Sequence, residues 1–180
     1  MNKRLLLRVL VALVVLTGLV VAVYAQLGGF EPVAIRLVNS PGPQLLAGAV
    51  FEGNARDSRL DSLFKAVRQL HQRGQLRGTL GSIYYEVSPG KRRKGEVSTF
   101  VGVWLADSAA SLPRGYRLRT VGASRLVQAR IESHFLVSPL PEEVQAAMRQ
   151  YARQRKLQTE NFVMEKYLND ESITLETPVK

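Results

Sequence analysis

Glu165 is the residue of this chain with the clearest potential for chemistry. It lies in segment 162–168, whose alternating pattern sends Val163, Glu165 and Tyr167 to one face of an expected strand. The other face carries Phe162, Met164, Lys166 and Leu168, a mostly apolar set that suits packing against helices. A carboxylate held among aromatic rings is unfavourable until a cation or hydrogen-bond donor arrives, because burying an unpaired charge is costly. Aromatic faces also attract cations. The sequence therefore predicts a site for a hydrophobic or cationic small molecule.

Other side chains are expected on the same face as this carboxylate. A displacement of 81 residues gives Ser82, Tyr84 and Glu86 the role of Val163, Glu165 and Tyr167. In segment 97–105, alternation leaves Phe100 and Trp104 on the open face, which is the face without helices, and directs the following residues toward the helices: Val97, Val101, Val103 and Leu105. The alternative is that Glu165 pairs with an arginine on an exposed face and that the aromatic residues are core. The predicted ligand-binding set is Glu165, Tyr84, Tyr167, Trp104, Phe100, Ser82, Glu86 and Val163.

No residue is assigned a catalytic role, although Glu165 and Glu86 are the available acid pair if the protein is an enzyme. The chain has no cysteine and two histidines, His71 and His134. This composition excludes thiol catalysis and thiolate metal sites, and a zinc site based on histidine would need more nitrogen ligands. The sequence predicts neither a metal nor a cofactor.

One half of the chain resembles the other. Ala66, Arg68 and Gln69 recur 81 residues later as Ala147, Arg149 and Gln150, and the apolar spacing around them coincides as well. We therefore expect two modules that face each other, in a domain at 33–180 with halves at about 33–105 and 114–180.

Each module is expected to run strand, strand, helix, strand, strand. One helix is capped by Asp57 or Ser58, and the other begins after Pro139 and Pro141. The economical packing is an α+β fold, in which the duplicated modules form an antiparallel sheet with pseudo-twofold symmetry and both helices on one face. The expected strands cover residues 33–39, 45–52, 80–87, 97–105, 115–121, 125–132, 162–168 and 172–179.

The N-terminus is a separate physical unit. The stretch from Leu5 to Ala25 is interrupted only by Arg8, and as a helix it is roughly 31 Å long, about the thickness of a bilayer core. We expect an uncleaved transmembrane anchor at 1–25 and a linker at 26–32, with a cleavable signal peptide as the alternative. The basic residues before the span keep the N-terminus inside. In a bacterium this predicts a single-pass inner-membrane protein with a periplasmic domain.

The charge of the chain is strongly positive. A net charge of +10 suits anionic lipid headgroups or acidic partners. The densest basic run, residues 91–94, lies between Pro89-Gly90 and Gly95 and is typical of a solvated hairpin tip. Export would separate this run from DNA, so nucleic acid is not an expected partner. The expected partners are a small-molecule ligand and, through the N-terminal helix, the membrane.

Several short motifs resemble a known family. Segment 163–170 (VMEKYLND) and segment 174–180 (TLETPVK) are similar to the GyrI-like small-molecule-binding domain, the effector-binding domain of multidrug-responsive transcription regulators. Segment 81–86 (GSIYYE) is similar to the family's Gly-x-x-Tyr-Tyr-Asp stretch, and segment 112–116 (LPRGY) resembles a proline–glycine–tyrosine turn of the family. The order and spacing of these motifs cover nearly all of 33–180.

This resemblance implies two modules with a ligand groove between them and a pocket acid that meets cationic drugs, a role that Glu165 matches. Glu86 departs from the usual aspartate, and Lys166 adds a charge beside the acid. Because no helix-turn-helix precedes the domain, we expect a membrane-anchored branch of the family and not a regulator of the usual kind.

Three functions remain open at this point. The first is a membrane-tethered binding domain for hydrophobic or cationic ligands. The second is a hydrolase of strained electrophilic molecules of the cyclopropane type, an activity that the resemblance implies because some GyrI-like proteins similar to this one hydrolyse strained rings. The third is a platform for an envelope partner that contacts the basic loop.

Overall fold

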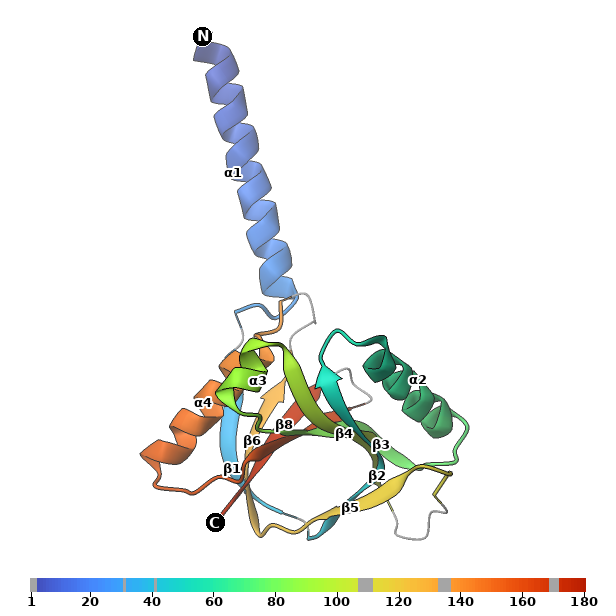
Figure 1. Cartoon of the computed structure of the whole chain (residues 1–180). Coiled ribbons are helices and arrows are strands. Elements are labelled where there is room, and N and C mark those ends of the chain that lie inside the picture. Colours follow the sequence, from blue (N-terminus) through green and yellow to red (C-terminus); the bar gives the residue numbers. More distant parts are fainter. Residues whose placement is uncertain (1–2, 31, 41, 107–111, 133–136, 169–171) are drawn as a thin grey trace.

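The structure is a computed structural model that describes residues 3–30, 32–40, 42–106, 112–132, 137–168 and 172–180 (Figure 1). Asn169 and Asp170, which end one of the motifs above, lie outside these ranges, as does His134. The elements in chain order are α1 (Lys3–Gln26), β1 (Ala34–Asn39), β2 (Gln44–Asn54), α2 (Ser58–Gln72), β3 (Gly78–Tyr85), α3 (Pro89–Arg93), β4 (Glu96–Leu105), β5 (Arg117–Val121), β6 (Arg125–Ile131), α4 (Pro141–Gln154), β7 (Phe162–Tyr167) and β8 (Ile173–Val179).

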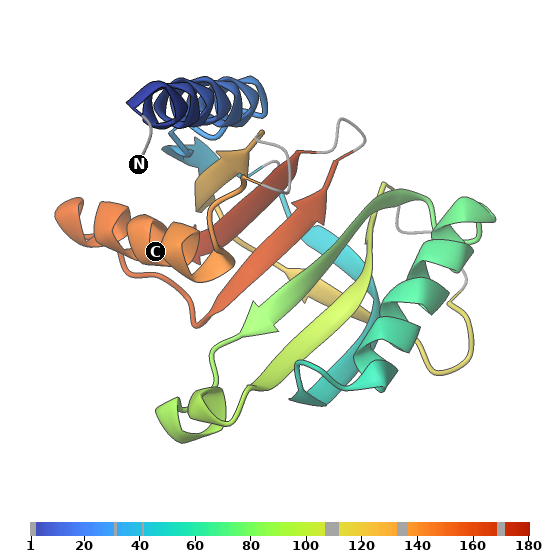
Figure 2. The ribbon, with the colours of Figure 1, turned by 90° about the horizontal axis from the view of Figure 1, so that it is seen from above.

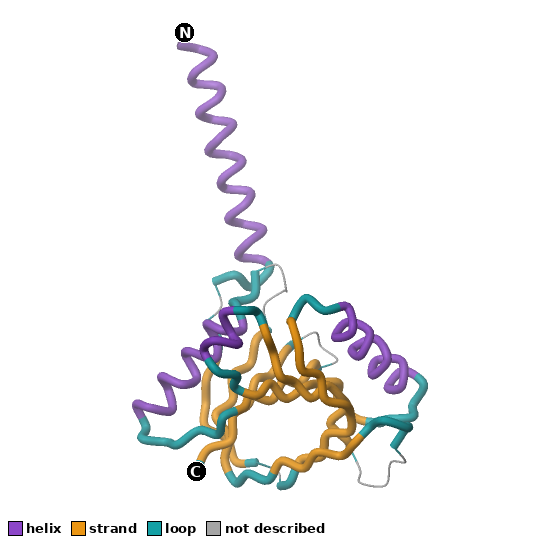
Figure 3. The backbone as a smooth tube through the Cα atoms, in the orientation of Figure 1, coloured by secondary structure: helices purple, strands orange, loops and turns teal. Residues whose placement is uncertain are grey.

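The strands form one eight-stranded antiparallel sheet in the order β1-β6-β8-β7-β3-β4-β2-β5 (Figure 3). The predicted α+β class and antiparallel sheet are confirmed. Each edge strand pairs with a strand from the other half of the chain: β1 pairs with β6, and β5 pairs with β2. If β1 to β4 are exchanged with β5 to β8 in turn, the result is the same strand order read from the opposite edge of the sheet.

At the centre of the sheet, the two halves meet at the pair β3 and β7. In this ladder Ile83 lies opposite Met164, and these two residues are 81 positions apart. Both side chains have no exposed surface. The register therefore agrees with the displacement seen in the sequence, although duplication itself remains a prediction.

Helices α2 and α4 cover the same face of the sheet (Figure 2). The α2 side of the core contains Val67 from the helix and Val101 from β4, whereas the α4 side contains Met148 from the helix and Leu175 from β8. Leu175, Glu165, Ser82 and Val101 form one row across four adjacent strands. Because paired residues share a face, this row joins the two cores and places both helices on one side.

Local signals explain where these helices begin. Asp57 caps α2, because its carboxylate accepts a hydrogen bond from the backbone N–H of Arg59 at 2.9 Å. Pro141 occupies the first turn of α4, and the carboxylate of Glu143 accepts from the backbone N–H of Leu140 at 3.2 Å. Both starts agree with the sequence.

The other face of the sheet carries a core of its own, formed by Leu46, Ile83, Phe100, Trp104, Val121, Leu126 and Met164. The strands bend around this core (Figure 3). Gly81 and Gly102 lie opposite each other in neighbouring strands, and a Cβ at either would run into the backbone of the adjacent strand. Glycine is therefore required at this close approach.

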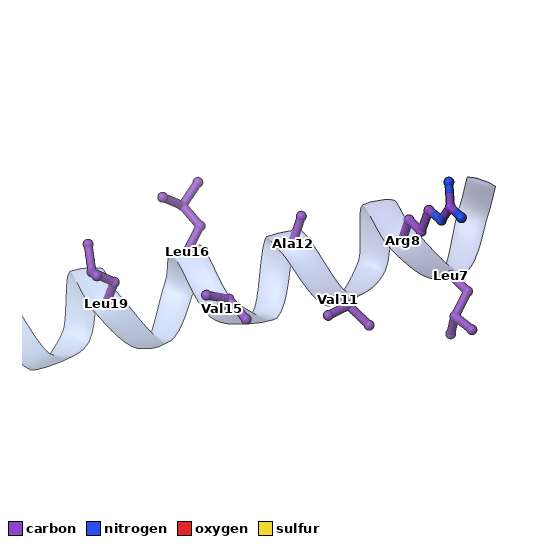
Figure 4. Close-up of a pocket in the computed structure, with 7 residues that line it drawn as sticks. All are labelled: Leu7, Arg8, Val11, Ala12, Val15, Leu16 and Leu19. Atoms are coloured by element: carbon purple, nitrogen blue, oxygen red, sulfur yellow. The ribbon is translucent and has the colours of Figure 1, made fainter. Parts of the chain in front are cut away.

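Helix α1 extends away from the sheet (Figure 1). Its segment Leu7–Gln26 has a mean hydropathy of 2.5 and no residue buried within the structure, so it is long and apolar enough to cross a membrane, a test that signal sequences also pass. Apolar side chains point to more than one side of this helix (Figure 4). An apolar surface of this kind suits a lipid environment.

Candidate functional site

The site is built by the two central strands. Register places Glu165 opposite Ser82, Tyr84 opposite Val163, and Tyr167 opposite Leu80. Val163 packs with the α4 side of the core and Leu80 with the α2 side, so this face is the one that the helices cover. We call the set Ser82, Tyr84, Val163, Glu165 and Tyr167 the Glu165 cluster.

Glu165 is a buried carboxylate with 9% of its surface exposed. Tyr167 donates a hydrogen bond from its hydroxyl to Glu165 Oε2 at 2.9 Å. Burial raises the pKa of Glu165, and the hydroxyls of Tyr167 and Ser82 offset part of this rise. The carboxylate is thus held at the centre of the sheet with little solvent to stabilise its charge.

The two tyrosines of the cluster remain protonated at neutral pH. Burial and the nearby charge of Glu165 raise the pKa of Tyr84 to about 12. Burial and the charges of Glu165 and Tyr84 also raise the pKa of the Tyr167 phenol. Both phenols therefore keep their proton, which Tyr167 already donates to Glu165.

Two buried hydroxyls on the same face of the sheet as Glu165 lack a well-oriented hydrogen-bond partner among the described residues. Ser82 Oγ and Thr99 Oγ1 are fully buried and make no hydrogen bond of good geometry within the described residues, although Ser82 lies close enough to influence the pKa of Glu165. Thr99 lies opposite Tyr84 in the β3–β4 ladder and so shares its face. Buried polar groups without partners are uncommon and mark places where a ligand can supply them.

No lysine or arginine in the described part of the chain forms an ion pair with Glu165. Its neighbour Lys166 points to the other face, where its Nζ lies 2.7 Å from Glu176 Oε2 and 5.5 Å from the ring centroid of Trp104. The exposed arginine pair of the alternative is therefore wrong, whereas its second part, that the aromatic residues are core, is correct for Phe100 and Trp104.

The predicted ligand set is divided between two faces. Phe100 and Trp104 pack in the core on the face opposite the helices, whereas the Glu165 cluster lies on the helix-covered face. The expectation that both rings share a face with Glu165 is wrong. Trp104 still touches the site from behind, because its indole N–H donates to the backbone carbonyl of Glu165 at 3.0 Å.

The expected orientation of β7 is wrong for the same reason. Phe162, Met164 and Lys166 were the set that suited the helices, but Met164 and Phe162 pack on the opposite face and Val163 packs toward α4. The face without helices therefore carries a hydrophobic core, and the Glu165 cluster lies on the opposite face, between α2 and α4.

Glu86 is separated from Glu165. It lies just beyond β3, it is exposed, and Arg92 Nη2 approaches its Oε1 at 3.2 Å. Glu86 is four residues from Ser82, the partner of Glu165, which corresponds to roughly 13 Å along a strand. The structure does not bring these two acids together at one bond of a substrate.

Thr99 and the pair Lys166–Glu176 were not singled out from the sequence. Thr99 has the same strand parity as Val97 and Val101, which were expected to face the helices, so alternation alone would have found it. The Glu176 contact depends on the pairing of β7 with β8. Among the described residues, no group of three His, Cys, Asp or Glu side chains is arranged to hold a metal ion.

Comparison with known proteins adds the fold. No family model matches the sequence, and no curated protein sequence matches it. The structure is similar to a hydrolase from Listeria innocua, at 14% identity over 87% of this chain and 98% of that chain, with a TM-score of 0.51. It is also similar to an uncharacterized conserved protein from Listeria innocua, at 16% identity over 81% of this chain and 92% of that chain, with a TM-score of 0.51.

A third similar structure is EcmrR in a complex with DNA, at 12% identity over 98% of this chain and 69% of that chain, with a TM-score of 0.57. At such identities the likeness shows the fold alone.

Proposed function

We propose that residues 33–180 form a binding domain for lipophilic organic cations, with Glu165 as the counter-charge, and that α1 tethers this domain to a membrane. One observation carries the proposal: Glu165 is buried between the cores of α2 and α4, and no cation in the described part of the chain pairs with it.

The energetic argument is that a ligand supplies what this carboxylate lacks. An unpaired buried charge is unfavourable, and a cation with an apolar body relieves that cost without bringing a hydration shell of its own. Tyr84 and Tyr167 offer ring faces to the cation. The Thr99 hydroxyl has no partner among the described residues and can bind a polar group of the ligand, whereas the Ser82 hydroxyl already interacts with Glu165.

The fold supports the same function. The sequence resembles the GyrI-like domain, in which the acid of the Glu-x-Tyr segment meets cationic drugs, and the segment Glu165-Lys166-Tyr167 matches it at both positions. The structural likeness described above is consistent with that family.

The tether rests on α1. Lys3 and Arg4 precede its apolar segment, so an uncleaved helix places the domain outside the cytoplasm. In a bacterium the domain then lies on the periplasmic side of the inner membrane. Sizing the mature protein by intact mass spectrometry distinguishes this arrangement from a cleaved signal sequence.

The hydrolase alternative has less support. It required two acids acting on one substrate, and Glu86 lies roughly 13 Å away along the strand. The cyclopropane-type reaction then depends on Glu165 alone. Turnover of a reactive cyclopropane by the wild type and not by Glu165→Gln would favour the enzyme.

The proposal is tested with two ions of matched shape and opposite charge, tetraphenylphosphonium and tetraphenylborate. The full chain is placed in nanodiscs and titrated calorimetrically, with empty nanodiscs as the reference for partitioning into lipid. We expect saturable binding of the phosphonium only, and Glu165→Gln should weaken it by about tenfold or more.

The pH dependence provides a second signature. Because the pKa of Glu165 is raised by burial, phosphonium affinity should increase as pH rises through that pKa and become constant above it. The exposed Glu52→Gln is the matched control and should bind like the wild type. Equal affinity of the wild type and Glu165→Gln would refute the assignment.

A further inference from the structure

The short helix α3 carries the densest positive charge of the described chain. We define the basic turn as Lys91, Arg92, Arg93 and Lys94, all of which are exposed. Arg92 forms an ion pair with Glu86, whereas Lys91, Arg93 and Lys94 form none within the described residues. Lys91, Arg93 and Lys94 therefore project into solvent without a counter-charge from the part of the chain that the structure describes.

The basic turn is ordered by hydrogen bonds. The backbone N–H of Arg92 donates to the carbonyl of Ser88 at 3.0 Å. Asn54 Nδ2 donates to the carbonyl of Lys94 at 3.1 Å, and the N–H of Ala55 donates to the carbonyl of Gly95 at 2.8 Å. These bonds join the basic turn to the β2–α2 turn, which adds the exposed cation Arg56.

The basic turn lies at the end of the domain from which α1 extends, whereas the β5–β6 turn lies at the opposite end (Figure 1). Seven residues separate α1 from β1, and even when fully extended they span at most roughly 25 Å. If α1 crosses a bilayer, the domain is held near the lipid surface with its α3 end closest to it.

We propose that the basic turn contacts anionic lipid headgroups of the membrane that α1 crosses. This inference rests on the tether in the proposed function and not on ligand binding at Glu165. The partner is fixed by charge complementarity and by the position of the cations at the end of the domain to which the last residues of α1 are joined.

Elementary electrostatics sets the size of the effect. Each lysine or arginine near an anionic bilayer strengthens the contact by roughly fivefold, and the attraction decays over a Debye length of about 8 Å at physiological salt. Lys91, Arg93 and Lys94 contribute most, since Arg92 is already paired with Glu86. High salt should therefore weaken the contact while α1 remains inserted.

The test uses single fluorescent labels in the full chain, which contains no cysteine. Gly90→Cys places a label beside the basic turn, and Gly122→Cys places one in the β5–β6 turn; an added Cβ meets nothing within 4 Å at either position. The labelled proteins are reconstituted in phosphatidylcholine alone or mixed with phosphatidylglycerol. Spin-labelled headgroups then quench labels near the surface.

We expect stronger quenching at position 90 than at 122, only in the anionic bilayer, and reversed by high salt. Lys91→Glu combined with Arg93→Glu and Lys94→Glu should remove roughly half or more of that quenching. The matched control reverses Arg114, Arg117 and Arg119, three exposed cations at or next to β5, and should leave it unchanged.

Equal quenching at the two positions, or quenching that ignores lipid charge and salt, would overturn the inference. Release of the protein from bilayers by alkaline carbonate would overturn the tether and this inference together. Loss of phosphonium binding concerns Glu165 alone, so the two failures are distinguishable. The salt dependence is measured on the wild-type charges and does not depend on whether the reversed variants fold.

Discussion

The backbone of Glu165 is well fixed by its neighbours, whereas the charge on its buried carboxylate is energetically unfavourable. Its backbone is fixed on both sides, by Ser82 in β3 and Leu175 in β8, and its carbonyl accepts from Trp104. Its carboxylate has Tyr167 as the one hydrogen-bond donor of good geometry in the described chain. The buried charge of Glu165 therefore lowers the free energy of unfolding, and a bound cation can offset this loss.

The first prediction concerns stability. The folded-state pKa of Glu165 is raised, so the native state keeps its proton to higher pH than the unfolded chain does. Stability then falls as pH rises from the unfolded pKa of about 4.3 to the folded pKa, and it stays at the lower level above that. Glu165→Gln should raise the free energy of unfolding at pH 7 by on the order of 1 kcal/mol.

Thermal melting across pH checks this expectation. The gain from Glu165→Gln should disappear below the unfolded pKa, where the wild-type carboxyl is neutral as well. Glu52→Gln, at an exposed position, should show no such pH dependence. A destabilised Glu165→Gln at pH 7 would mean that the carboxylate has a stabilising partner.

At the scale of elements, the sequence predicted the strands and helices but not their faces. Alternation correctly separated Val163, Glu165 and Tyr167 from Phe162, Met164 and Lys166. It could not decide which set faces the helices, because both contain apolar and polar members. That choice depends on the register between β7 and β3, and a shift of one residue exchanges the faces.

Strand β4 shows the opposite case. Its helix-facing set is apolar except for Thr99, and the expectation that Val97, Val101 and Val103 face the helices is correct. The error was to place Trp104 with Tyr84, since Tyr84 is paired with Thr99. Helix α3 was also missed, because five residues rich in cations carry no apolar periodicity.

The second prediction concerns the bend in the sheet. Gly81→Ala should lower the free energy of unfolding by roughly 2–4 kcal/mol, because its Cβ would meet the carbonyl oxygen of Glu165 and the indole nitrogen of Trp104. Gly122→Ala, where an added Cβ meets nothing within 4 Å, is the matched control. Chemical denaturation measures both, and equal stabilities would show that the strands can separate to admit a methyl group.

At the scale of the whole molecule, the arrangement of the edges could not be read from the sequence. The sequence predicted the order of elements within each module but not the strand pairing, in which β1 lies against β6 and β5 lies against β2. The pairs Ala34↔Arg130 and Gln44↔Val121 each join segments far apart in the chain. Hydrophobic periodicity is a local signal and carries no information on such partners.

The third prediction follows from these edges. If a protease site replaces residues 107–111 and is cleaved after folding, the two fragments should remain together in gel filtration, because the β1–β6, β2–β5 and β3–β7 ladders all cross the cut. Each fragment made alone should lack cooperative melting. Clean separation of the cleaved fragments under native conditions would contradict the exchanged edges.

The exchange of edge strands also bears on how such a chain can arise. Two identical copies of a single module could form the same sheet as a homodimer. Each copy would exchange its first strand with the other, as in domain swapping. Joining the two copies in one gene makes their partnership permanent and frees each half to change separately. An acid could then settle at position 165 while its counterpart at position 84 became tyrosine.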